Sequence, residues 1–187
     1  NIDEAFSNVY FSNQSKTTKS FMISIVDGFI ERESELIPLI EKAKVDNAPC
    51  ILICRGMSDN ARKHLKNILL TNKVYLYPYI CKFDNNDPFL LDDIAKISNI
   101  KKISSDFLDN IYKHIVEKSG IVKATLQKDK IIFFEKSDNL ISEINQKLSE
   151  SLLDSDLKNY LQKRKLRCSP NIVNVSIPFD QIELLTE

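Results

Sequence analysis

The side chains that most often act as metal ligands or nucleophiles are few in this chain and lie far apart. None of the cysteines or histidines forms a C-x-x-C pair or a ligand-like spacing: Cys50, Cys54, Cys81, Cys168, His64 and His114. Structural zinc needs four closely paired ligands, so no zinc site is expected. Cys50 and Cys54 flank a short apolar run, which predicts that both are buried free thiols in a reducing compartment.

Motifs for nucleotide binding and hydrolysis are missing as well. The chain has three glycines, which cannot form a P-loop or a dinucleotide-binding fingerprint: Gly28, Gly56 and Gly120. There is no G-x-S-x-G elbow. The carboxylate pairs at 92–93 and 154–156 lie where helices should begin, so we interpret them as helix-start charges. The sequence therefore gives little support to an enzyme.

Composition and charge argue for an ordinary globular domain. Of the 187 residues, 43% are hydrophobic and 28% are charged, and the formal net charge is zero. Such a chain has no overall attraction to nucleic acid or to an acidic membrane. Basic stretches at 62–66 and 158–167 lie on helical patterns with apolar opposite faces, so we interpret them as solvated faces. No apolar run approaches the ~20 residues that span a bilayer.

The elements that would position these residues alternate between strand and helix through the first two thirds of the chain. Strand patterns occupy 21–26, 50–54, 74–81 and 101–104, and helical patterns occupy 30–44, 60–70, 88–97 and 107–116. Pro38 inside the first helical pattern should kink the helix or lie in a late first turn. Ser58 or Asp59 can cap the second. This alternation predicts an α/β architecture.

The last third of the chain has a different pattern. Residues 121–126 and 130–135 predict a β-hairpin. Residues 140–151 and 154–166 predict two amphipathic helices, and residues 172–177 predict a last strand.

The order of several motifs resembles the apical domain of GroEL-type (group I) chaperonins. Residues 5–13, A-F-S-N-V-Y-F-S-N, resemble the family's G-Y-x-S-P-Y-F-x-N segment, and residues 36–41, L-I-P-L-I-E, resemble its M-L-P-V-L-E helix. The step from Pro38 to Pro49, just before strand 50–54, matches the family's spacing without a gap. Residues 91–95 resemble the L-x-D-I-A helix, and residues 161–164 resemble the L-Q-E-R helix. Each match alone is weak, and their shared order carries the resemblance.

The resemblance implies a swivelling β/β/α fold, with a β core flanked by helices. It implies that residues 1–187 are a single apical, polypeptide-binding domain of a longer chain. Residues 1–4 and 171–187 would then lead to an intermediate-domain hinge. Such a domain is not an enzyme, and ATP and Mg would be bound by an equatorial domain of the parent protein, in an oligomeric ring.

The resemblance also implies a function and a set of binding residues. An apical domain binds unfolded polypeptides and a GroES-type cochaperonin on one apolar groove and contacts other subunits of the ring. Carried over by position, the groove uses Phe6, Tyr10, Phe11, Ile37, Ile40 and Leu65. For Ile37 and Ile40, a place in the core is an equal alternative. An organelle matrix, plastid-type or mitochondrial, is the expected location, with a bacterial-type cytoplasm as the alternative.

Departures from the family pattern leave other functions open. Arg62, Lys66 and Asn67 replace apolar residues of the second groove helix, and Pro170 and Asn171 replace paired glycines at the hinge. These changes predict a narrower clientele. The alternatives are a chaperonin-like scaffold or assembly protein that has lost the groove, and an α/β nucleotide-binding enzyme domain.

Overall fold

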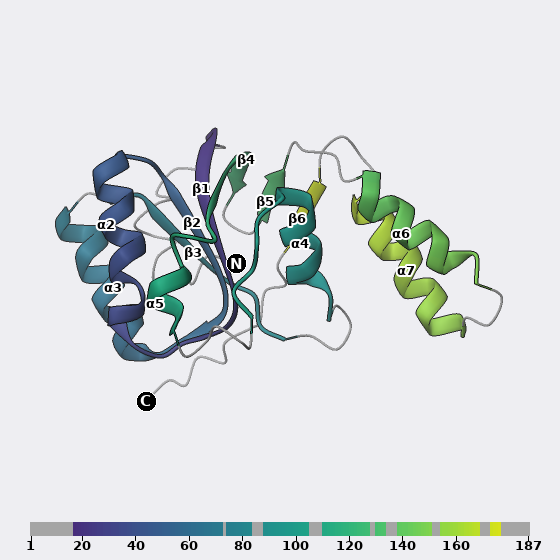
Figure 1. Ribbon diagram of the computed structural model, residues 1–187, viewed down its shortest axis with the longest axis horizontal. Coiled ribbons are helices and arrows are strands. Elements are labelled where there is room, and N and C mark those ends of the chain that lie inside the picture. Colours follow the sequence, from purple (N-terminus) through teal and green to yellow (C-terminus); the bar gives the residue numbers. More distant parts are fainter. Residues whose placement is uncertain are drawn as a thin grey trace, which may run out of the picture.

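The protein contains one mixed sheet of six strands in the order β3-β2-β1-β4-β5-β6. The computed structural model describes residues 17–72, 74–83, 88–104, 110–127, 130–133, 138–150, 154–168 and 173–176. The strands are β1 (Thr17–Ile30), β2 (Cys50–Met57), β3 (Leu76–Ile80), β4 (Gly120–Gln127), β5 (Lys130–Phe133) and β6 (Val173–Ser176). The expected α/β architecture, a β core flanked by helices, is confirmed (Figure 1).

One half of the sheet is parallel and is covered by two helices. Strand β1 pairs in parallel with β2, and β2 with β3. The crossovers contain α2 (Ile37–Asp46) and α3 (Asp59–Asn72). Because both crossovers step in the same direction, the right-handed rule places both helices on one face of the sheet. Figure 1 shows them together on one side, with α4 (Leu90–Ser98) on the other.

The buried strand β2 explains why helices are needed on this half. Residues 50–54 are all buried, as expected for a continuously apolar run in a parallel sheet. Cys50 and Cys54 are free thiols in this core, so their predicted burial is confirmed. Burial, with a smaller contribution from the charge of Asp46, raises the pKa of the Cys50 thiol to about 12.

The other half of the sheet is antiparallel. Strand β1 pairs with β4, β4 with β5 and β5 with β6, so the predicted hairpin and last strand are confirmed. The predicted strand at 101–104 is reduced to one bridge, between Ile103 and Val26. The predicted helix at 107–116 is shorter, because only α5 (Ile111–His114) is helical, and residues 105–109 lie outside the described part of the chain.

The first predicted helix, at 30–44, begins later than expected. Strand β1 continues to Ile30, a 3-10 turn η1 (Glu33–Glu35) follows, and α2 starts at Ile37. Pro38 therefore lies in the first turn, where its missing N–H costs no hydrogen bond. Ser58 caps α3, because its Oγ accepts a hydrogen bond from the Ala61 N–H at 3.1 Å.

Helices α6 (Asp138–Leu148) and α7 (Ser155–Cys168) form a hairpin that extends beyond α4 (Figure 1). A buried ion pair holds it there: Arg164 of α7 donates from Nε to both carboxylate oxygens of Asp93 in α4, at 3.0 and 2.8 Å. Arg164 is 6% exposed and Asp93 1%. Burial opposes the charge on Arg164, but Asp93 outweighs it and raises the pKa of the guanidinium. The Phe89 ring lies 5.1 Å from the guanidinium carbon.

Removing one partner of the Arg164–Asp93 pair should destabilise the protein far more than replacing both partners with apolar residues. Asp93→Leu leaves Arg164 buried without its counter-charge, and we expect a loss of about 3–5 kcal/mol in the free energy of unfolding. The double variant Asp93→Leu/Arg164→Met should recover most of that loss, because no unpaired charge remains. Urea unfolding of the chain measures both.

A matched surface pair serves as the control. Lys96 of α4 also binds Glu143 of α6, but both side chains are largely exposed. Glu143→Gln should therefore cost less than about 1 kcal/mol. A loss below 1 kcal/mol for Asp93→Leu would contradict the role given to the buried pair.

Candidate functional site

The expected groove residues have different environments in the structure. Phe6, Tyr10 and Phe11 lie outside the described residues. Ile37, the first residue of α2, is 41% exposed. Leu65 was expected to line an open groove, but it is 0% exposed and belongs to the core. Ile40, for which the core was an equal alternative, is 2% exposed and also belongs to the core. Of the described candidates, Ile37 alone offers apolar surface to a partner.

The burial of Ile40 and Leu65 follows from the helical repeat. In α2, Ile40 lies on the same stripe as Leu39 and Ala43, and all three are buried. In α3, Leu65 shares its stripe with the buried Ala61. Side chains three and four positions apart share one helix face, and this face has to cover the apolar sheet. A sequence pattern identifies such a stripe but does not say whether it faces the sheet or solvent.

An open cleft of about 480 Å³ lies between η1 and α3. One wall, called the η1 wall, consists of Glu31 and Arg32, which precede η1, and of Glu33, its first residue. The other, the α3 wall, consists of Asn60, Lys63, His64 and Asn67. The α3 wall has the i, i+3, i+4, i+7 spacing of a single helix face. We call Ile37 and these seven lining residues the α2–α3 surface.

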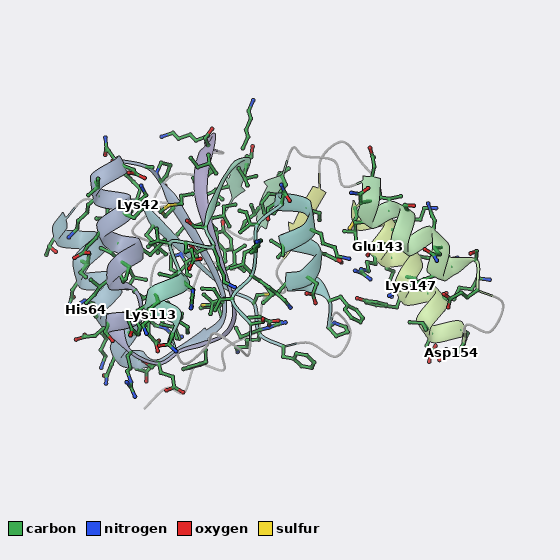
Figure 2. All side chains as sticks on the ribbon, in the orientation of Figure 1. Lys42, His64, Lys113, Glu143, Lys147 and Asp154 are labelled. Carbon is green, nitrogen blue, oxygen red and sulfur yellow. The ribbon has the colours of Figure 1, made fainter. Side chains whose placement is uncertain are left out.

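Hydrogen bonds shape the η1 wall. The Glu35 carboxylate accepts from the backbone N–H groups of Glu31 at 2.9 Å and Arg32 at 3.1 Å, which fixes the turn ahead of α2. Across the cleft, Nδ1 of His64 lies 3.1 Å from Oε2 of Glu33. In Figure 2, His64 lies on the side of the molecule opposite the hairpin residues Glu143 and Lys147. The cleft is thus a polar site on the α2–α3 side.

The outer face of α3 is basic, as its sequence predicted. Lys63, Lys66 and Asn67 are exposed. Arg62 is half-buried and lies 3.8 Å from the Asp59 carboxylate. The sequence identified Arg62, Lys66 and Asn67 but missed the cleft residues on η1. The signal available for the α3 wall was its run of polar residues at helical spacing.

A second cluster of charges lies toward the carboxyl ends of the parallel strands, where α/β enzymes often bind ligands. Asp27 of β1 accepts a hydrogen bond from Nε of Arg55 and another from Nζ of Lys102, both at 2.7 Å. Lys102 also lies 2.6 Å from a carboxylate oxygen of Asp92. Two cations and two carboxylates therefore neutralise one another at this edge. The arrangement ties β1, β2, α4 and the segment at 101–104 together.

Two of these groups have shifted pKa values. Burial would raise the pKa of Asp27, but the hydrogen bonds and charges of Lys102 and Arg55 outweigh it and lower the pKa from 3.8. Burial would lower the pKa of Lys102, but Asp27 and Asp92 outweigh it and raise the pKa. Within the described ranges, no group of three His, Cys, Asp or Glu side chains is arranged to hold a metal ion. No helix in the described part of the chain is long and apolar enough to cross a membrane.

The Asp27 cluster predicts a pH-dependent contribution to stability. Because folding lowers the pKa of Asp27, its contribution is fully present above the unfolded value and is lost as the pH falls through the folded value. At neutral pH, Asp27→Asn should cost about 1.5–3 kcal/mol, as expected for hydrogen bonds to charged groups. The cost should shrink below about pH 4. Urea unfolding between pH 7 and pH 3 measures it.

The exposed Asp46, which pairs with Lys42 at 2.9 Å, provides the control. Asp46→Asn should cost about 0.5 kcal/mol or less. A cost for Asp27→Asn that does not change with pH would contradict a lowered pKa for Asp27.

The fold is similar to part of a phage chaperonin of known structure. No protein-family model and no curated protein sequence matches the chain. Two crystal forms of the chaperonin gp146 from the bacteriophage EL 2 (Pseudomonas aeruginosa), in the presence of ATP-BeFx, match it with TM-scores of 0.56 and 0.53. Each match has 16% sequence identity and covers 82% of this chain and 32% of the chaperonin chain. The chain therefore has a chaperonin-like α/β fold and spans about a third of the chaperonin it resembles.

Proposed function

We propose that this chain is the polypeptide-binding domain of a chaperonin-type protein and that it binds non-native polypeptides on the α2–α3 surface. The fold supports the proposal, because it resembles part of a phage chaperonin. The observation that carries the proposal is Ile37, an exposed apolar side chain at the start of α2. It follows η1, whose first residue lines one wall of an open cleft. Phe6, Tyr10 and Phe11 stay in the proposal as apolar contacts contributed by the opening segment.

A surface of this kind binds weakly at each site. A fully buried apolar side chain contributes ~1.5–3 kcal/mol, and the loss of freedom on association offsets much of it. A ring of such domains binds the same chain at several points and recovers affinity through multivalency. The proposal therefore includes a ring of subunits, a GroES-type cochaperonin on the same surface, and ATP and Mg bound elsewhere in the parent protein. An organelle matrix stays a prediction.

The polar cleft favours a narrow range of clients. A general substrate groove must present apolar groups that fit many sequences, whereas here Ile40 and Leu65 are sealed in the core. The same burial favours a second candidate function, a chaperonin-like scaffold or assembly protein that no longer binds unfolded chains. The two candidates differ in whether Ile37 contacts a client.

Replacing Ile37 tests the proposal directly. We expect the chain to bind fluorescently labelled, reduced and carboxymethylated lactalbumin, which stays unfolded, with an affinity measurable by fluorescence anisotropy. Ile37→Glu should weaken this binding about fivefold, since the side chain is 41% exposed and has roughly 1 kcal/mol of apolar contact left to gain.

The same helix offers a matched control. Val45, near the other end of α2, is 82% exposed, so Val45→Glu makes the same kind of change outside the α2–α3 surface. Its affinity should equal that of the unaltered chain. Absence of binding, or equal losses for the two variants, would exclude this surface as a client site and favour the scaffold.

A further inference from the structure

We infer that the cleft between η1 and α3 binds a carboxylate side chain of the client polypeptide, an inference that rests on the proposed function. Bound clients would then be selected for an acidic residue close to the apolar residue that contacts Ile37. Three features of the cleft favour a carboxylate: the donors of the α3 wall, the carboxylate that already lies against it, and the charge of its lining residues.

The α3 wall presents hydrogen-bond donors along one helix face. Asn60 and Asn67 have side-chain amides, Lys63 has an ammonium group, and His64 has a ring nitrogen directed to the cleft. Lys63 and both asparagines are exposed, so water is their alternative partner. A carboxylate is the one side-chain group that can accept from several such donors at once and also balance the charge of Lys63.

The protein shows where a carboxylate fits. Oε2 of Glu33 lies 3.1 Å from Nδ1 of His64, so a carboxylate of the chain itself already lies against the α3 wall. Glu33 is exposed and belongs to a short 3-10 turn, so water is the alternative partner of its carboxylate. An incoming carboxylate would take its place on His64 and accept from Lys63 as well. Glu33 is thus an internal competitor for the client's acidic residue.

The charges of the lining residues determine which wall of the cleft a client carboxylate contacts. Among the residues that line the α3 wall, Lys63 carries a positive charge and none carries a carboxylate. The opposite wall has Glu31 and Glu33 beside Arg32. A client carboxylate is therefore attracted to the α3 wall and repelled from the η1 wall. The cleft of about 480 Å³ is open to solvent, so a client side chain can reach the α3 wall.

Two peptides that differ only in charge test this inference. The probes are a short fluorescein-labelled peptide that alternates leucine with glutamate and its counterpart with glutamine in place of glutamate. Anisotropy titrations with the full chain should show tighter binding of the glutamate peptide, by about two- to fivefold, as an exposed ion pair allows. Lys63→Gln should remove this preference, and Glu33→Gln should increase it, because the internal competitor is gone.

Lys66→Gln is the matched control, because Lys66 is an exposed lysine of the same helix that does not line the cleft. If Lys66→Gln removes the preference as fully as Lys63→Gln, net charge explains it and the inference is overturned. Equal binding of the two peptides, lost with Ile37→Glu, would also overturn the inference and leave the proposed function standing. Absence of binding by either peptide would overturn both.

Discussion

The structure depends on covering the parallel strands β1, β2 and β3 with apolar side chains. Strand β2 lies between two parallel neighbours and is apolar on both faces, so each face needs a layer of helix or loop. On one face, α2 and α3 supply that layer with Leu39, Ile40 and Leu65. Side chains that are buried against the sheet cannot also contact a client. What the two helices offer to a partner is therefore limited to the residues beside and opposite the apolar stripe.

This constraint explains the character of the α2–α3 surface. Ile37 precedes the buried stripe of α2 and stays partly exposed, while the outward face of α3 consists of Asn60, Lys63, Lys66 and Asn67. The result combines one apolar contact with a polar cleft. A surface with few apolar groups has little affinity for unfolded chains in general, so selectivity has to come from charge and hydrogen bonding.

Ion pairs, one fully buried and others partly buried, hold the remaining parts in place. The Asp27 cluster connects β1 and β2 with α4 and the segment at 101–104, and the Arg164–Asp93 pair connects α4 with the α6–α7 hairpin. Asp92 and Asp93 are neighbours in the first turn of α4, so this turn contributes a carboxylate to the Asp27 cluster and another to the pair with Arg164. The hairpin is therefore fixed from the opposite side of the sheet, away from the candidate site.

The sequence predicted most helices and strands correctly, but it predicted the environments and partners of their side chains less well. Periodicity predicted the strands at 50–54 and 121–126 and both helices of the hairpin, because a strong apolar repeat reports the local conformation. It placed the start of the first helix too early, since charged residues at 31–35 suit a helix start as well as a turn. It interpreted Asp92 and Asp93 as helix-start charges and missed Lys102 and Arg164 as their partners, because a pairing between distant segments leaves no local signal.

At the candidate site, too, the sequence did not predict which side chains are exposed. Resemblance by position identified Ile37, Ile40 and Leu65 together, and only the tertiary structure separates the exposed residue from the two core residues. The cleft was not predicted, because its walls come from η1 and α3, which are more than twenty residues apart in the chain.

The most direct test of client binding on the α2–α3 surface is hydrogen–deuterium exchange of the full chain, with and without an excess of permanently unfolded polypeptide. We predict slower exchange on binding in η1, the first turn of α2 and the N-terminal half of α3, with no change in α6 and α7. Protection confined to the hairpin or to the antiparallel strands, or no protection anywhere, would contradict it.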